Sequence, residues 1–278
     1  MLENTYNELK KKPGNKYNFI MKGGLAVKAA LFTLCKATWK KTFLPHTWEK
    51  SNLIQLYKSK GLRSDLDNMR HIHIKEEDPK FFGHLVVSAV KVKIITTLTK
   101  FQLACKPGHR TQEHLFVIKS VFALYESCNI ALILTMWDLS KFFDRESLTD
   151  CMNELYKRGI KGKLYRLLYM MNKNTRISVQ TPVGPTEEED TGEGVGQGTL
   201  EGALVSSANL DSGVDDFFHN SEYEISYGEI PLQPILYQDD VARMSDDLKS
   251  AQMGNNKMEA LAETKLLSYN LDKFCFNV

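Results

Sequence analysis

Two apolar runs that each lead into aspartate constrain this chain more than any other feature. Near the C-terminal end, apolar residues 234–236 lead into Tyr237-Gln238-Asp239-Asp240. A second run, at residues 130–137, ends on Asp138. A hairpin turn and a strand end can bring these three carboxylates to one point, and carboxylates commonly hold two divalent ions roughly 3.5–4 Å apart. The pattern therefore predicts that Asp138, Asp239 and Asp240 converge around a pair of metal ions.

Each acidic feature also has a simpler explanation. Aspartate favours turns because its side chain hydrogen-bonds the nearby backbone, so Asp239-Asp240 could be an acidic turn and nothing more. Asp138 could cap the helix that we expect after it, although Asp144 fits that role better. The apolar strands on both sides of Asp239-Asp240 favour the metal site, because a turn between buried strands focuses both carboxylates at one point.

The composition is that of an ordinary globular chain with a sizeable core. Its 278 residues are 42% hydrophobic and 25% charged, which is close to the average for globular proteins. No apolar run approaches the length of about 18 residues that indicates a membrane span. The start of the chain lacks the basic-then-apolar pattern of a signal peptide. We therefore expect an intracellular protein, in the cytoplasm or the nucleus, with no membrane partner.

The cysteines indicate a reducing compartment. They occupy positions 35, 105, 128, 151 and 275, far apart and without a CxxC pair. This spacing argues against a zinc finger and against a disulfide framework. Cys128 and Cys151 lie on apolar faces, and we predict that both are small core residues.

Charge is distributed unevenly along the chain. Residues 1–63 contain 13 Lys or Arg against 3 Asp or Glu, whereas residues 186–247 contain 16 acidic residues against one Arg. The basic end suggests a phosphate-rich partner. For any single lysine, a solvated surface position is the simpler interpretation.

Hydrophobic periodicity predicts alternating helices and strands. We expect helices at residues 25–43, 79–100, 111–125, 148–156, 164–171, from about 201 and at 257–269. We expect strands at residues 51–57, 72–74, 130–137, 176–181, 223–227 and 232–244, the last as a hairpin. The apolar run at 130–137 predicts a strand buried on both faces, and residues 186–193 predict an acidic loop. The order predicts an α+β fold with a sheet covered mainly on one face.

A glycine-rich stretch, Gly194-Val195-Gly196-Gln197-Gly198, precedes the helix expected from about residue 201. It lacks both the GxGxxG spacing of a dinucleotide fold and the GK[ST] of a P-loop. Glycines allow a backbone to approach a flat or charged partner closely. Gln197 could hydrogen-bond the edge of a base or a sugar.

Six segments in one order resemble the motifs of reverse transcriptases of the non-LTR retrotransposon and group II intron branch. Asp138-Leu139-Ser140-Lys141-Phe142-Phe143-Asp144 resembles their first metal-binding motif, residues 194–198 their template-gripping motif, and Tyr237-Gln238-Asp239-Asp240 their catalytic hairpin. Residues 54–61 with 67–70, residues 102–110, and residues 270–273 are similar to the flanking motifs. The resemblance covers roughly residues 40–278.

The resemblance implies an α+β polymerase of the right-hand type, with palm and fingers and an antiparallel palm sheet backed by helices. Residues 1–110 would form an N-terminal extension and fingers, and residues 111–278 a palm with interleaved finger elements. A thumb and an endonuclease are not expected within the chain, and both could belong to a longer polyprotein. The expected partners are an RNA template, a DNA primer and dNTPs.

The resemblance also implies roles for individual residues. Asp138 and Asp239 would bind two Mg²⁺ ions, with Mn²⁺ as an alternative; Asp240 would support them, and the Leu139 carbonyl would add a ligand. Phe143 matches the bulky residue that excludes a ribose 2′-hydroxyl. The remaining roles are the triphosphate for Lys58, Lys60 and Arg70, the template and incoming nucleotide for Gln197 and Gly198, and protonation of pyrophosphate for Lys273.

Several departures from the family pattern leave alternatives open. His71 replaces the proline of the usual Asn-Tyr-Arg-Pro-Ile, Leu200 replaces a proline after the template-gripping glycine, and Cys105 replaces a phenylalanine. Without a thumb, we expect the chain alone to extend a primer poorly. The alternatives are an inactive nucleic-acid-binding relic and an RNA-directed RNA polymerase. Tyr237 and Phe143 favour DNA synthesis, and the intact aspartates argue against decay.

Overall fold

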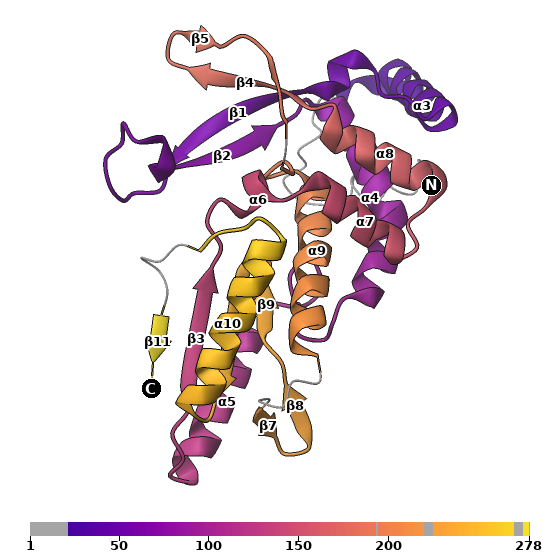
Figure 1. The fold of residues 1–278 in the computed structure, drawn as a ribbon. Helices are drawn as coiled ribbons and strands as arrows, with labels where there is room; N and C mark the ends of the chain where they lie inside the picture. Colours follow the sequence, from indigo (N-terminus) through magenta and orange to yellow (C-terminus); the bar gives the residue numbers. More distant parts are fainter. Residues whose placement is uncertain (1–21, 193, 220–224, 270–274, 278) are drawn as a thin grey trace. The chain divides into compact units, whose positions relative to one another are not determined.

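The computed structural model describes residues 22–192, 194–219, 225–269 and 275–277, and it shows a mixed α+β protein (Figure 1). The chain forms two compact units. The first comprises Met1–Lys93 and Leu155–Ala203, and the second comprises Ile94–Glu154 and Leu204–Val278. Each unit is therefore built from two separate stretches of sequence.

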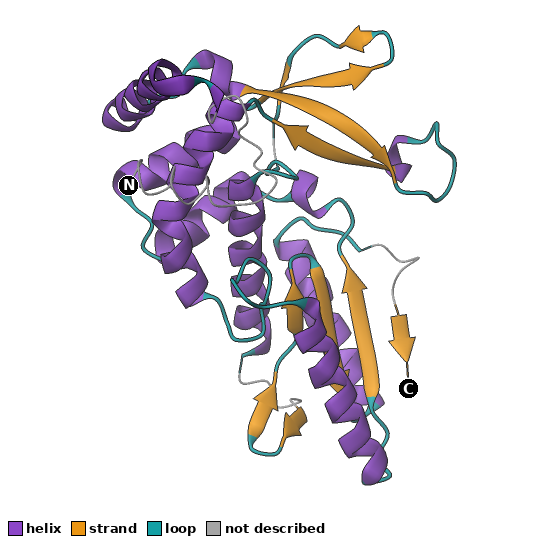
Figure 2. Cartoon of the chain, turned by 180° about the vertical axis from the view of Figure 1, so that it is seen from behind, coloured by secondary structure: helices purple, strands orange, loops and turns teal. Residues whose placement is uncertain are grey.

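A five-stranded sheet forms part of the first unit, and its longer strands are drawn in orange in Figure 2. Its main path is β2 (Met69–Ile74), β1 (Lys50–Tyr57), β4 (Arg176–Thr181) and β5 (Gly184–Pro185), and β6 (Glu189–Asp190) also pairs with β4. Strand β1 is antiparallel to β2 and parallel to β4. The pairing of β1 with β4 joins the two stretches of sequence that make this unit.

Aromatic contacts pack the helices of the first unit. These helices are α3 (Gly24–Lys41), α8 (Gly162–Lys173) and the first part of α4 (Glu77–Thr97), with short 3₁₀ helices at His46–Glu49 and Leu66–Asn68. The Phe32 ring stacks on Phe81 of α4 with ring centroids 6.2 Å apart. Trp48 is buried, and its ring lies 5.2 Å from that of Phe82. Both contacts fix α4 to the segment that leads into β1.

A buried ion pair joins three elements of the first unit. The Lys75 ammonium, just after β2, lies 3.2 Å from Glu201 Oε1 at the start of α9 (Leu200–Phe218). It also donates to the Met171 carbonyl of α8 at 3.1 Å. The Lys75 and Glu201 side chains are only 8% and 6% exposed. Because a buried charge without its partner costs several kcal/mol, each of these side chains depends on the other.

The second unit is built on a four-stranded antiparallel sheet. Its order is β11 (Cys275–Asn277), β3 (Ile133–Asp138), β10 (Asp240–Ser245) and β9 (Ile235–Tyr237). Every pairing in it is antiparallel. Side chains alternate between the two faces of a sheet, and residues directly opposite one another share a face.

Helices cover both faces of this sheet. Trp137 of β3 and Val241 of β10 are opposed, and they share a core with residues of α9 and α10 (Leu248–Thr264). Leu134 and Met244 are opposed on the other face, and they pack in a cluster with residues of α5 (Thr111–Ser127). The expectation of a sheet covered mainly on one face is therefore wrong, because residues of α5 pack on the second face near the start of β3.

The remaining elements of the second unit are short. Helices α6 (Phe142–Arg145) and α7 (Leu148–Lys157) follow β3, and α7 continues into the first unit. Strands β7 (Ile225–Tyr227) and β8 (Ile230–Leu232) form a separate hairpin. Among the helices that the structure describes, none combines the length and the apolarity that a membrane crossing requires.

Two expectations about burial are wrong. The strand expected at 130–137 begins at Ile133, and Met136 within it is 42% exposed, so it is not buried on both faces. A nearly unbroken apolar run does not reveal this difference, because almost every position in it is compatible with burial. Cys128 is exposed, whereas Cys151 is buried as predicted.

Two expectations about element boundaries are also wrong. The last helix begins at Leu248 rather than near residue 257, because the Asp247 side chain caps it by accepting a hydrogen bond from Ser250 N at 2.6 Å. The acidic segment 186–193 is not entirely a loop, since it contains β6. The Arg176 guanidinium lies 3.2 Å from Glu188 there, which offsets part of the acidic charge.

We predict that Lys75→Met lowers the free energy of unfolding by about 3–5 kcal/mol, because it leaves Glu201 buried without its cation. The Lys75→Met/Glu201→Leu double variant should regain most of that loss, since apolar side chains replace both charges. Urea unfolding followed by circular dichroism measures both changes.

The matched control is the exposed pair of Lys50 and Glu188 in the same unit. Lys50→Met should leave the urea midpoint almost unchanged, because exposed ion pairs contribute little to stability. A double variant no more stable than Lys75→Met alone would contradict the dependence of the two charges on each other.

Candidate active site

A two-residue turn joins β9 to β10 and carries the first of the adjacent aspartates. Tyr237 pairs with Asp240, so Gln238 and Asp239 form the turn. Gln238 has a φ of 62°, and a positive φ at the first turn residue alone is the pattern of a type II′ turn. Glycine usually occupies this position. A left-handed backbone conformation costs a non-glycine residue on the order of 1–3 kcal/mol, so neighbouring groups must hold Gln238 in place.

The pairing of β3 with β10 places Asp138 directly opposite Asp240. Directly opposed residues of antiparallel strands have Cα atoms about 4.5–5.5 Å apart and side chains on the same face. The preceding pair, Trp137 and Val241, is buried on the other face. The Asp138 and Asp240 carboxyl groups therefore leave the sheet together, next to the turn that holds Asp239.

The donor types at this point fit a hard divalent cation. Mg²⁺ and Mn²⁺ prefer carboxylate oxygens, and Asp138, Asp239 and Asp240 supply three carboxylates. Across the described ranges of the chain, no three His, Cys, Asp or Glu side chains form a group that could hold a metal ion. The strand register thus places the three aspartates near one another along the backbone. Their side chains do not form a complete metal-binding group in this structure.

The two expected site residues after Asp138 belong to the core of the same unit. Leu139 is 4% exposed and its side chain lies in the core, so only its backbone could serve a ligand. Phe143 of α6 is half-buried against the same core, and its ring meets that of Phe142 edge-on at 5.5 Å. Core packing therefore fixes the backbone that follows Asp138.

A buried acid, Glu146, directly follows α6. It is 1% exposed, and its Oε1 accepts a hydrogen bond from Asn209 Nδ2 at 3.0 Å. Asn209 Oδ1 in turn accepts from Lys265 Nζ at 2.7 Å. Glu146 Oε2 has no hydrogen-bond partner among the described residues. Burial raises the pKa of Glu146 to about 7, although the nearby Ser206 and Asn209 side chains and the Lys265 charge oppose the rise.

Glu146 is not among the site residues predicted from the sequence. Its neighbours Arg145 and Ser147 are polar, and no periodic signal marks position 146 as buried. Its hydrogen-bond partner Asn209 lies 63 residues away in α9, so the environment that raises its pKa exists only in the folded chain.

In the first unit, the expected triphosphate-binding residues lie at one end of the β1–β2 hairpin. Arg70 is paired with Leu56, and Lys58 N donates to the Asn68 carbonyl at 2.8 Å. Lys60 and Arg70 are exposed and Lys58 is half-buried. Three cationic side chains thus come from one end of this hairpin.

The glycine-rich turn packs on the same hairpin. The Gln197 carbonyl accepts a hydrogen bond from His73 N at 2.9 Å. Gly198 has a φ of 91°, and a Cβ at this position would lie 3.0 Å from Ile72 Cγ2. Glycine suits position 198 both for its conformation and for this close approach. Gln197 and Gly198 therefore lie against the strand that carries Arg70.

The expected site residues thus form two groups. Within the second unit the structure brings together the turn, the end of β3 and α6, which carry Asp138, Leu139, Phe143, Asp239 and Asp240. Within the first unit it brings together Lys58, Lys60, Arg70, Gln197 and Gly198. Lys273 lies outside the described residues.

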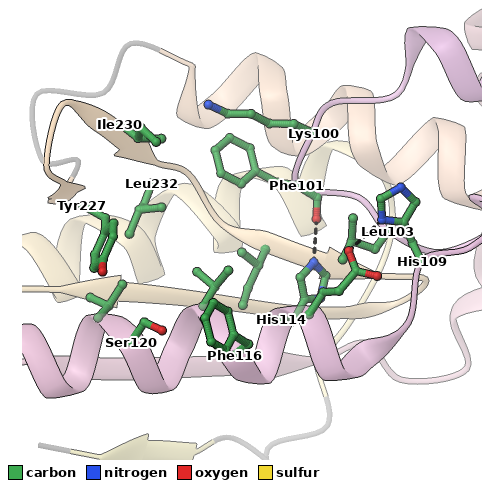
Figure 3. Close-up of a pocket in the computed structure, with 14 residues that line it drawn as sticks. Lys100, Phe101, Leu103, His109, His114, Phe116, Ser120, Tyr227, Ile230 and Leu232 are labelled. Atoms are coloured by element: carbon green, nitrogen blue, oxygen red, sulfur yellow. Dashed lines mark hydrogen bonds and ion pairs between the residues drawn. The ribbon is translucent and has the colours of Figure 1, made fainter.

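An apolar groove of about 450 Å³ lies in the second unit between α5, the segment 100–103 and the β7–β8 hairpin (Figure 3). His114 lines it, and His114 Nε2 donates to the Phe101 carbonyl at 3.1 Å. The His114 ring meets that of Tyr237 edge-on at 6.3 Å. Burial lowers the pKa of His114. The lining of the groove is mainly apolar, and none of the site residues predicted from the sequence lines it.

No protein-family model and no curated protein matches this chain. Solved structures share its fold. Telomerase from Candida albicans, in complex with a TWJ fragment of telomeric RNA, aligns with 91% of this chain at 12% identity and a TM-score of 0.62. Apo telomerase from Candida tropicalis, truncated from its C-terminal domain, aligns with 89% of this chain at 10% identity and a TM-score of 0.59.

The chain spans about half the length of these telomerase chains, 46% of the first and 55% of the second. Telomerase is a reverse transcriptase, so this chain has a reverse-transcriptase-like fold. At such low identity the likeness concerns the fold alone.

We predict that the wild-type protein loses stability between about pH 5 and pH 8 relative to Glu146→Gln. The folded pKa of about 7 lies above the ordinary value of 4.5, so the folded state binds more protons in this window. The stabilisation is therefore complete below the unfolded pKa and is lost as the pH rises through 7. The full loss should amount to about 3 kcal/mol.

Urea unfolding at several pH values measures this difference. Glu259→Gln, at an exposed acid on α10, is the control and should follow the wild-type profile. Parallel pH profiles for the wild type and Glu146→Gln would contradict a raised pKa for Glu146.

Proposed function

We propose that this chain is the polymerase part of a reverse transcriptase, which copies an RNA template by adding dNTPs to a primer 3′-hydroxyl. The observation that carries the proposal is the register of β3 with β10, in which Asp138 lies opposite Asp240 beside the turn containing Asp239. The reverse-transcriptase-like fold supports the same assignment. The second unit would act as the palm and the first as the fingers.

The three aspartates would hold the catalytic ions. When bound, two Mg²⁺ or Mn²⁺ ions would activate the primer hydroxyl and stabilise the leaving pyrophosphate. Asp138 and Asp239 would contact both ions, and Asp240 would support them. The Leu139 carbonyl would add a neutral oxygen. Because the Leu139 side chain is fixed in the core, its backbone would need little reorganisation to do so.

The other residues would bind and select substrate. Arg70 would offer a bidentate fork to the triphosphate, and Lys58 and Lys60 would act as point charges. The glycine-rich turn would let the template backbone and the incoming nucleotide approach Gln197 and Gly198 closely. Phe143 would exclude a ribose 2′-hydroxyl, and Lys273 would protonate the leaving pyrophosphate.

The finer assignment is to the non-LTR retrotransposon and group II intron branch. It rests on the order and the amino-acid sequences of the six motifs, chiefly residues 138–144, 194–198 and 237–240. An RNA template with a DNA primer would be the partners. The telomerase from Candida albicans is itself bound to RNA, which is consistent with an RNA template for this chain.

One alternative function has a specific observation in its favour. A nucleic-acid-binding protein that has lost catalysis would also keep the fold and the basic segment at residues 1–63. The lack of an assembled three-carboxylate group among the described residues is compatible with this reading. Nucleotide addition distinguishes the two functions.

The test is single-nucleotide addition by excess protein to a DNA primer on an RNA template, with Mg²⁺ or Mn²⁺. We expect the complementary dNTP to be added in preference to the rNTP. Asp239→Asn should lower the rate by about 100-fold or more, because ion-mediated charge stabilisation contributes several kcal/mol. Asp216→Asn, at an exposed position on α9, makes the same charge change and should keep the wild-type rate.

Other outcomes identify the alternatives. Binding of the primer–template without addition, at every protein concentration, would favour the binding protein. A preference for rNTPs would indicate an RNA-directed RNA polymerase. Equal rates for the wild type and Asp239→Asn would contradict the assignment of the turn.

A further inference from the structure

Residues 101–103, which precede α5 in the sequence, pair with the strand β9 that leads into the turn carrying Asp239. Leu236 N donates to the Phe101 carbonyl at 3.0 Å, and Leu103 N donates to the Leu236 carbonyl at 3.1 Å. Gln102 thereby forms a parallel bridge with Leu236. Residues 101–103 thus act as one more short strand on the edge of β9, next to the turn.

The Gln102 side chain reaches the turn itself. It is fully buried, and its Oε1 accepts hydrogen bonds from Gln238 N at 3.3 Å and from Ala104 N at 3.0 Å. Gln238 is the residue with φ of 62° that directly precedes Asp239. The Gln102 side-chain oxygen therefore connects residues 101–103 to Gln238, the turn residue with the positive φ.

A second hydrogen bond holds Gln238 from α9. Ser207 is fully buried, and its hydroxyl donates to Gln238 Oε1 at 3.0 Å. The Cys105 thiol lies 3.9 Å from the same oxygen. Gln238 is thus held through its backbone by Gln102 and through its side chain by Ser207.

The amide oxygen at position 102 serves two backbone donors, Gln238 N and Ala104 N. Gln102 Nε2 has no hydrogen-bond partner among the described residues, and a buried unpaired donor lowers stability. An apolar side chain would remove this unpaired donor but would leave Gln238 N and Ala104 N without their acceptor. A carboxylate would add a buried negative charge near Asp239 and Asp240. A neutral amide supplies an acceptor for Gln238 N without adding charge.

We propose that Gln102 is a positioning residue for the catalytic turn: it fixes the Gln238 backbone and thereby the direction of Asp239. The inference rests on the proposed polymerase function for its catalytic consequence. The hydrogen bond that it invokes exists whether or not the chain is an enzyme. Gln102 touches no substrate in this role and acts only through Gln238.

The first experiment measures hydrogen–deuterium exchange in metal-free and nucleotide-free protein. Gln102→Met keeps the length and volume of the side chain and removes the acceptor. We expect exchange in peptides covering residues 236–241 to rise at least tenfold, with exchange in α10 and in the β1–β2 hairpin unchanged. Thr135→Val is the matched control: it removes a buried hydroxyl of β3 that also has no partner among the described residues and should leave this segment unchanged.

The second experiment measures nucleotide addition by the same variants. For Gln102→Met we expect kcat to fall by 10-fold to 100-fold, with KM for the dNTP and primer–template affinity within about threefold of the wild type, because loss of alignment affects the reacting state and not initial binding. If Gln102→Met does not fold, Gln102→Asn replaces it, since its amide is one methylene too short to reach Gln238 N.

The two measurements separate the proposals. Unchanged exchange at residues 236–241 in a folded Gln102 variant would overturn the positioning role, whatever the activity. Faster exchange with an unchanged kcat would also overturn it. If the wild type adds no nucleotide, the polymerase function fails, and exchange alone then decides whether Gln102 holds the turn.

Discussion

The antiparallel pairing of β3 with β10 is the interaction on which the rest of the structure depends. It determines both which side chains form the core and which aspartates lie opposite one another. Trp137 and Val241 bury themselves with residues of α9 and α10, and one residue further along the pair Asp138 and Asp240 points to the other face. A slip of one residue would reverse the faces of β3 and place Asp138 toward the core. Burial of the large Trp137 side chain therefore fixes the register that places Asp138 opposite Asp240.

The second unit keeps unusual polar groups inside its core close to these strands. Glu146 follows the segment that begins with Asp138, Gln102 supports the turn, and Arg243 of β10 is 4% exposed with its guanidinium donating to Ser245 and Ser250. Buried polar groups of this kind lower stability unless every hydrogen bond is made. Glu146 Oε2 and Gln102 Nε2 have no partner among the described residues. Such groups concentrate where position matters more than stability, which agrees with a functional site at the end of β3.

Much of the fold could be predicted from local pattern. The apolar periodicity located α3, α4, α5 and most strands, and the two aspartate motifs pointed to residues that proved to be neighbours across β3 and β10.

What could not be predicted depends on contacts between distant segments. Lys75 and Glu201 are 126 residues apart, and nothing in either neighbourhood marks them as a buried pair. The start of α10 was missed because Asp247, which caps it, looks in sequence like one of two adjacent surface acids. Cys128 is exposed at the C-cap of α5, a helix end that the apolar pattern around it does not reveal.

The most direct test of the central claim is Mn²⁺ binding in the presence of a dNTP. The electron paramagnetic resonance signal of the free ion measures how much Mn²⁺ remains unbound. If the β3–β10 register forms a carboxylate site, the wild-type protein will remove Mn²⁺ from solution, and Asp138→Asn will lose most of that binding although residue 138 lies about a hundred positions from the turn. Asp216→Asn will bind as the wild type does. Equal Mn²⁺ binding by the wild type and Asp138→Asn, or no binding by either, would contradict the claim that this strand pairing builds a metal site.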